Sequence, residues 1–201
     1  MKYSWNLKDK IILFKKYFQL EEYLVNHELF RGGDSPTFTR EVFERGNVVA
    51  VLLYDPALRQ VVLTEQFRIG AIHKQTNPWL IECVAGVIDE GETPVDVAHR
   101  ESQEEAGCQI QVLKKITEYF VSPGGTTEHC SLFCGICDSS KAGGIHGLEY
   151  ENEDIRVLVV SSQEAFEWMN SGKINSSATI IALQWLQLNE SIIVDQNQSG
   201  P

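Results

Sequence analysis

The chain has 201 residues, of which 43% are hydrophobic and 22% are charged. This length and composition indicate one filled hydrophobic core with a small additional lobe, and they exclude two full domains and a low-complexity chain. The formal net charge of −11 gives a surface that repels nucleic acid and anionic lipid, so we expect neither nucleic acid nor a membrane as a partner.

Residues 1–45 are expected to form a small N-terminal β lobe. Apolar runs alternate there with lysines, acids and polar residues, which is typical of short strands, and Gly32-Gly33-Asp34 indicates a turn. The first residues lack the apolar stretch of a secretory signal. The longest uncharged apolar run, 48–54, is far shorter than the roughly 20 residues that cross a bilayer. We therefore expect a cytoplasmic protein.

Residues 46–190 are expected to form the main domain, followed by a frayed tail over 191–201. β-branched and apolar runs predict strands over 48–54, 60–66, 79–84, 112–121, 129–137 and 155–161. Start and stop signals predict helices over 94–106, 163–170 and 177–188. Because strands and helices are mixed without a regular alternation, we expect a mixed sheet with helices on both faces.

The helix over 94–106 has the clearest boundaries. Thr93 is an N-cap residue with Asp96 three positions later, Pro94 suits the first helical position, and Gly107 ends the helix. A narrow stripe that packs on the sheet is expected on one face of this helix, made of Val95, Ala98, Ser102 and Ala106.

Three acids, Glu101, Glu104 and Glu105, are expected to share the opposite face of this helix. Glu101 and Glu105 lie about 40° apart at 100° per residue, and Glu104 lies about 60° to the other side of Glu101. Arg100 can reach Glu104, but one arginine cannot neutralise three carboxylates. Such a face is either a solvated acidic surface or a site for a hard cation such as Mg²⁺. Glu104 and Glu105 lie near the helix C-terminus, where anions are disfavoured, and this favours the metal site.

Cys130, Cys134 and Cys137 have the C-x3-C-x2-C spacing of an iron–sulfur site. On a regular strand, however, Cys137 points to the face opposite Cys130 and Cys134, so the three thiolates cannot hold one cluster. We interpret them as ordinary strand residues. The odd number of cysteines, five in all, indicates a reducing compartment.

The segment from Gly86 to Cys108 resembles the Nudix box, G-x5-E-x7-R-E-U-x-E-E-x-G-U, in which U is aliphatic. All seven fixed positions match: Gly86, Glu92, Arg100, Glu101, Glu104, Glu105 and Gly107. Ser102 and Cys108 replace the two aliphatic residues, and we expect this to alter helix packing and not chemistry. The resemblance implies an α/β/α sandwich and an enzyme that hydrolyses a nucleoside diphosphate linked to another moiety.

The resemblance also implies a magnesium site, at which Mn²⁺ is also suitable. Two or three ions would bind Glu101 and Glu105, with Glu104 and the backbone carbonyl of Ala85 as further ligands. Such ions clamp a pyrophosphate, cancel its charge and lower the pKa of the attacking water. The net charge of −11 agrees with this, because an acidic protein needs a cation to attract a phosphorylated substrate.

From about residue 40 to residue 188 the chain resembles the bacterial ADP-ribose pyrophosphatases. The matching segments are 40–46, 65–69, 78–82, 122–128, 144–155 and 181–188, and Pro123 lies sixteen residues beyond Gly107, as in that subfamily. The resemblance implies hydrolysis of ADP-ribose to AMP and ribose 5-phosphate. It also makes Glu151 the catalytic base and Glu153 a metal ligand, in an acidic loop that closes over the substrate.

The same resemblance assigns the contacts to the substrate. Arg68 and Glu128 would bind the phosphates and the terminal ribose. Arg40 and Glu41 would reach the adenine end across a dimer interface, and Tyr17 would stack on the adenine, although an aromatic residue among early strands is also typical of a core. The family exchanges its N-terminal strands between protomers, so a homodimer is implied. A lobe too short to bury its own apolar residues permits such an exchange.

Two alternatives stay open at this point. A Nudix hydrolase of another nucleotide sugar, such as GDP-mannose, has the same box, because the box defines only the pyrophosphate chemistry. The loop 144–148 and the pair Arg40-Glu41 favour ADP-ribose. A non-catalytic ADP-ribose sensor usually lacks box carboxylates or carries a DNA-binding domain, whereas this chain keeps every box carboxylate.

Overall fold

The structure is a computed structural model, which describes residues 3–74 and 77–198. It contains two compact units. The first consists of Met1–Asn47 with Tyr119–Cys130, and the second consists of Val48–Glu118 with Ser131–Pro201. The first unit therefore includes a segment around residue 125 that the sequence patterns assign to the main domain.

The first unit is built on a three-stranded antiparallel sheet in the order β1-β2-β3. Its strands are β1 (Trp5–Lys15), β2 (Gln19–His27) and β3 (Phe38–Glu44). They are longer than the short strands expected, because two irregularities in the β1–β2 register absorb the interruptions in the apolar pattern. The Phe43 N–H donates to the Gly125 carbonyl at 2.8 Å, which joins the 119–130 segment to β3.

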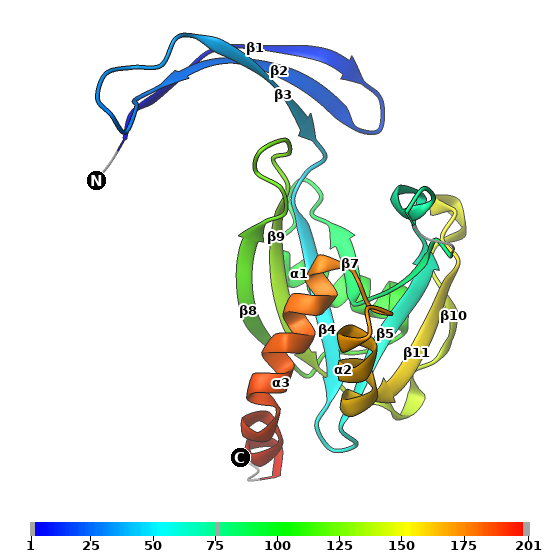
Figure 1. The fold of residues 1–201 in the computed structure, drawn as a ribbon. Helices are drawn as coiled ribbons and strands as arrows, with labels where there is room; N and C mark the ends of the chain where they lie inside the picture. The colour runs from blue at the N-terminus through cyan, green and yellow to red at the C-terminus, as the bar shows by residue number, and fades with distance from the viewer. Residues whose placement is uncertain (1–2, 75–76, 199–201) are drawn as a thin grey trace. The chain divides into compact units, whose positions relative to one another are not determined.

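The second unit is built on an eight-stranded sheet. Its strands are β4 (Val48–Asp55), β5 (Gln60–Phe67), β6 (Trp79–Glu82), β7 (Val84–Val87), β8 (Val112–Phe120), β9 (His129–Ile136), β10 (Gly144–His146) and β11 (Ile155–Ser161). The order is β10-β11-β5-β4-β9-β8, with β6 paired to β5 and β7 paired to β4 (Figure 1). Seven of the eight residues of β4 are buried, as expected for a central strand that is covered on both faces.

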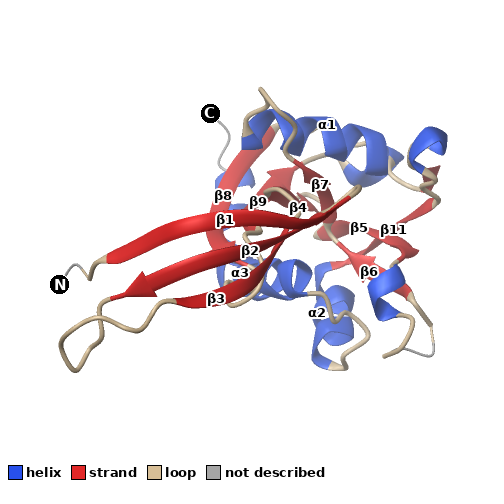
Figure 2. Cartoon of the chain, turned by 90° about the horizontal axis from the view of Figure 1, so that it is seen from above, coloured by secondary structure: helices blue, strands red, loops and turns tan. Residues whose placement is uncertain are grey.

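Helices cover both faces of this sheet. Helix α1 (Pro94–Ala106) packs on β7 and β4, whereas α2 (Ser162–Asn170) and α3 (Ser177–Gln198) pack on the opposite face (Figure 2). Three short 3₁₀ turns, η1 (Ile69–Ala71), η2 (Ser139–Lys141) and η3 (Glu149–Glu151), lie in the connections. The expected α/β/α sandwich is confirmed. Among the described residues, no helix is long and apolar enough to cross a membrane.

Helix α1 has the bounds that its sequence predicts, and three of the four residues of the expected stripe, Ala98, Ser102 and Ala106, are buried. The Thr93 side chain and Asp96 form a capping box, and Gly107 ends the helix with φ 64°. The expected stripe is wrong at Val95, which is 48% exposed, while Glu105 is buried. Ala98 and Glu105 are seven residues apart, so they lie only about 20° apart on the helix and share its sheet-facing side.

Helix α3 is longer than expected. The predicted end at residue 188 is wrong, because the helix continues through Gln198 and buries Ile193 and Val194 against the rest of the unit. The Tyr54 hydroxyl on β4 donates to Glu190 at 2.9 Å, which ties this extension to the sheet. Most of the expected tail is thus helical, and residues 199–201 lie outside the described residues.

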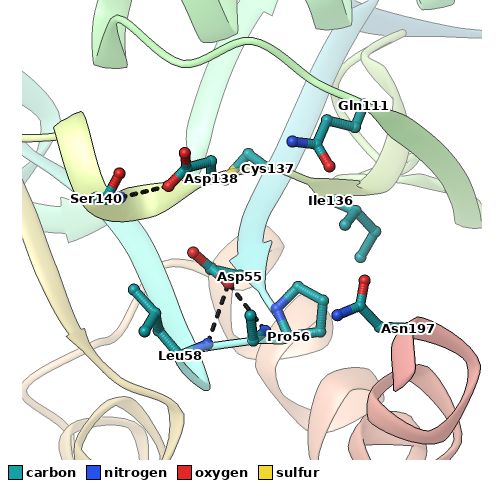
Figure 3. Close-up of a pocket in the computed structure, with 10 residues that line it drawn as sticks. Asp55, Pro56, Leu58, Gln111, Ile136, Cys137, Asp138, Ser140 and Asn197 are labelled. Carbon is teal, nitrogen blue, oxygen red and sulfur yellow. Dashed lines mark hydrogen bonds between the residues drawn. The ribbon is translucent and has the colours of Figure 1, made fainter. Parts of the chain in front are cut away.

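Asp55, at the end of β4, holds two connections together beside a cavity of about 350 Å³ (Figure 3). One carboxylate oxygen accepts the N–H groups of Ala57 and Leu58 at 2.9 and 3.1 Å. The other accepts the N–H and the hydroxyl of Ser139 at 2.9 and 3.0 Å. Because all four donors point at a buried carboxylate, Asp55 fixes the turn after β4 and the start of η2.

We expect Asp55→Asn to lower the free energy of unfolding by about 1–3 kcal/mol, because the amide would place N–H donors against two of the existing donors. For a chain of this size each kcal/mol corresponds to roughly 2–4 °C in Tm. Thermal unfolding checks this, with Asp34→Asn in an exposed loop as the control. Equal Tm values for the two variants would show that Asp55 has no such role.

Candidate active site

Two carboxylates of α1 face strand β7. The Ala85 N–H donates to Glu105 Oε2 at 3.1 Å. The next residue, Gly86, leaves room for Glu101, because a Cβ built at Gly86 would lie only 1.7 Å from Glu101 Oε1. A methyl group at this position would therefore displace the Glu101 carboxylate. The glycine permits a close approach between helix and strand that no other residue type would permit.

Both carboxylates lose most of their contact with water in this position. Glu105 is 2% exposed, and its burial raises the pKa to about 8 against the opposing hydrogen bond from Ala85. Burial also raises the pKa of Glu101 to about 7, although Arg100 favours the ionised form. Two neighbouring acids whose pKa values are raised by burial are typical of a functional site.

Arg100 binds three acids, whereas the sequence predicts only its contact with Glu104. Its Nε lies 2.8 Å from Glu92 Oε1, and its Nη1 lies 2.7 Å from Glu101 Oε1 and 3.2 Å from Glu104 Oε2. The Arg100 guanidinium lowers the pKa of Glu92, which lies in the loop before the helix. Arg100 therefore ties that loop to the helix face through its ion pairs with Glu92, Glu101 and Glu104.

Arg68 lies just after β5 on the same side of the second unit as Glu105, since its charge lowers the pKa of that residue. Its Nε lies 2.6 Å from Glu82 Oε2, and this bond orients the guanidinium. Glu82 lies in the matching segment 78–82, but no role was predicted for it. A single charged residue at the end of the short apolar strand Trp79–Glu82 is the signal that could have found it.

The acidic loop before β11 contributes further carboxylates. The charge of Glu153 raises the pKa of both Glu101 and Glu105, so the loop faces them. Glu153 Oε2 accepts the Leu148 N–H at 3.3 Å. Glu151 is exposed on η3, and the charges of Glu151 and Glu104 add to the desolvation that raises the pKa of Tyr150. The structure thus brings the predicted loop acids to the acidic face of α1.

The carboxylates are not arranged as a ready-made metal cage. Within residues 3–74 and 77–198, no three His, Cys, Asp or Glu side chains are placed to hold a metal ion. Glu101 instead bonds to Arg100, Glu105 to Ala85 and Glu153 to Leu148. These are hydrogen bonds that a cation can replace.

The remaining predicted residues belong to the first unit. Tyr17 is 87% exposed in the β1–β2 turn, and Arg40 and Glu41 lie on β3. Glu128 is buried and pairs with Arg45 at 3.3 Å. Arg45 lies in the matching segment 40–46, but no role was predicted for it.

Comparison with known proteins places this geometry in a family. The NUDIX domain model matches residues 44–191. The chain is 47% identical over 184 residues to the ADP-ribose pyrophosphatase of Escherichia coli (strain K12), which covers 92% of this chain and 88% of that protein. It is 47% identical over 180 residues to the ADP-ribose pyrophosphatase of Haemophilus influenzae, covering 88% and 83%.

Two further likenesses are more distant. A GDP-mannose pyrophosphatase of Cronobacter sakazakii is 37% identical over 188 residues, covering 90% of this chain and 94% of that protein. The crystal structure of an ADP compounds hydrolase has a TM-score of 0.67 at 16% identity, covering 94% and 96%, which shows the fold. With the family model over most of its length and relatives at 47% identity, this chain belongs to the NUDIX family.

Proposed function

We propose that this NUDIX hydrolase cleaves the pyrophosphate of ADP-ribose, releasing AMP and ribose 5-phosphate. One observation carries the proposal: the charge of Glu153 raises the pKa of both Glu101 and Glu105, which lie against β7 where Gly86 leaves room for the Glu101 carboxylate. The relatives named as ADP-ribose pyrophosphatases share 47% identity with the chain, and those named as GDP-mannose pyrophosphatases share less.

The residues of the site fit a hard divalent cation. The donors are all oxygen atoms, the two central carboxylates are buried with raised pKa values, and Gly86 provides space for Glu101. We propose two or three Mg²⁺ ions, for which Mn²⁺ could substitute, held by Glu101, Glu104, Glu105, Glu153 and the Ala85 carbonyl. Bound ions would neutralise the pyrophosphate and lower the pKa of the attacking water.

The side chains around these acids would position the substrate. Arg68, oriented by Glu82, presents a planar guanidinium that suits a diphosphate oxygen. Glu151 is exposed on η3 above the acidic face and is suited to accept a proton from water. The ion pairs of Arg100 would keep Glu101 and Glu104 in place while the substrate binds.

We further propose that the active enzyme is a cytoplasmic homodimer that exchanges its N-terminal strands. All eleven residues of β1 are exposed, among them Trp5 at 76%, and a strand with such an apolar row is suited to a second copy of the chain. In that dimer, Arg40, Glu41 and Tyr17 would contact the adenine end of the substrate. Glu128, held by Arg45, would contact the terminal ribose.

The alternative substrate is GDP-mannose, which the relatives at 37% identity favour. We expect release of AMP from ADP-ribose to be fast with Mg²⁺ and to stop with excess EDTA, whereas GDP-mannose and NADH are turned over much more slowly. Chromatography of the products measures all three reactions. Preference for GDP-mannose would overturn the substrate assignment, and a rate that persists in EDTA would overturn the metal site.

Glu105→Gln tests the buried charge in metal-free protein. A carboxyl whose pKa is raised to about 8 in the folded state stabilises the fold less and less as the pH rises toward that value. In EDTA we therefore expect the variant to have a Tm several degrees above the wild type at pH 8, and a clearly smaller difference in Tm at pH 5.5, because the loss of stability runs from the unfolded pKa of 4.5 up to about 8. The variant should also lose most of the stabilisation that Mg²⁺ gives the wild type.

The control for this test is Glu149→Gln, which changes an exposed glutamate. Its Tm should follow that of the wild type at both pH values, with and without Mg²⁺. If the Tm of the Glu105 variant also equals that of the wild type at both pH values, the pKa of Glu105 is not raised by burial.

Glu151→Gln tests the proposed base. We expect kcat to fall by about 10²- to 10⁴-fold, since that is what a general base contributes, while KM for ADP-ribose changes little because Arg68 is intact. Steady-state kinetics beside Glu149→Gln, in the same 3₁₀ turn, measures the difference. If turnover falls in the Glu149 variant instead, the base is Glu149.

A further inference from the structure

The imidazole of His146 fills the space beside the last glycine of the acidic helix. Gly107, the C-cap of α1, has φ 64°, and a Cβ built on it would lie 2.8 Å from His146 Cε1. His146 ends β10, a strand that packs against α1. The ring therefore lies against the helix end, two residues beyond Glu105.

The ring has a fixed orientation in this position. His146 Nε2 lies 2.9 Å from the Gly143 carbonyl oxygen, and because a carbonyl can only accept, Nε2 carries the hydrogen. Gly143 and Gly144 have φ values of 140° and 88°, so the chain bends around the ring. The backbone of His146 also pairs with Ile155, which is fully buried at the start of β11.

The contact continues from His146 to the acidic loop. A Cβ on the next residue, Gly147, would lie 2.7 Å from Glu153 Cβ, so the loop folds tightly onto this glycine. Two hydrogen bonds join Glu153 to Leu148. The Leu148 N–H donates to Glu153 Oε2 at 3.3 Å, and the Glu153 N–H donates to the Leu148 carbonyl oxygen at 3.3 Å. Close packing contacts therefore connect Gly107 to His146 and, through the adjacent Gly147, to Glu153.

These contacts matter because α1 and the loop before β11 both carry acidic side chains. Glu153 raises the pKa of Glu101 and Glu105, so the loop and the helix repel each other when the acids are ionised. A packed side chain between the two elements opposes that separation. Carboxylates that must bind one cation need to be held near their final places before it arrives.

We propose that His146 is a positioning residue, whose ring against Gly107 sets the place of the loop that carries Glu151 and Glu153 relative to Glu101 and Glu105. This inference rests on the proposed function, since it assigns His146 a part in assembling that site. It gives the glycine at the end of the box a second purpose besides ending the helix.

The test compares His146→Ala with His146→Gln and with His99→Ala, which removes an exposed histidine on α1. Binding of Mn²⁺ to each full-length protein is measured without substrate, from the electron paramagnetic resonance signal of the free ion. We expect His146→Ala to weaken Mn²⁺ binding by about tenfold or more, as removal of a supporting residue does at metal sites. His146→Gln keeps a planar N–H donor for the Gly143 carbonyl, so its Mn²⁺ affinity should lie nearer that of the wild type. The Mn²⁺ affinity of His99→Ala should equal that of the wild type.

Kinetics and stability complete the test. For ADP-ribose, kcat should fall in His146→Ala while KM changes less, because Arg68 is unaffected. A lower Tm in EDTA with unchanged Mn²⁺ affinity of the folded protein would show a purely structural role and overturn the proposal. His146→Gln provides the same comparison if the alanine variant does not fold.

The proposed function can fail separately. If the wild-type protein binds Mn²⁺ but leaves ADP-ribose intact, the substrate assignment is wrong, and the Mn²⁺ dissociation constants alone decide the role of His146.

Discussion

The placement of two acidic side chains between α1 and β7, one buried and one half-buried, is the constraint on which the rest of the site depends. Glu101 occupies the space that a side chain at Gly86 would take, and Glu105 reaches the backbone of Ala85. Desolvation opposes both placements, as the raised pKa values show. The capping box and the buried stripe hold α1 on the sheet, so both carboxylates stay where desolvation makes them less stable as anions.

Two arginines border this acidic centre and serve different purposes. Arg100 is used inside the protein, since its contacts with Glu92, Glu101 and Glu104 join the loop before α1 to the helix. Arg68 is held by Glu82 on a neighbouring strand, so its guanidinium has a defined orientation toward the site. A chain with a net charge of −11 can accept an anionic pyrophosphate only where such local charges, together with metal ions, reverse the field.

Much of this could be predicted from the sequence where the signals are local. Thr93, Asp96 and Gly107 define the ends of α1 because caps act within a few residues. The spacing of Glu101, Glu104 and Glu105 identifies the acidic helix for the same reason. The buried stripe was harder to predict, because the side of a helix that meets the sheet depends on where the sheet lies. The length of α3 depends likewise on distant partners such as Tyr54.

Sequence patterns were enough to predict the fold class, the bounds of α1 and the acids that the box places on this helix, since periodicity and box spacing are properties of neighbouring residues. The burial of Glu105, the ion pair of Arg68 with Glu82 and the contact of the His146 ring with Gly107 could not be predicted, because they depend on how the elements pack. These are contacts between residues 14 to 39 positions apart or between helix and sheet. Their energies depend on desolvation and close packing, which exist only once the elements have come together.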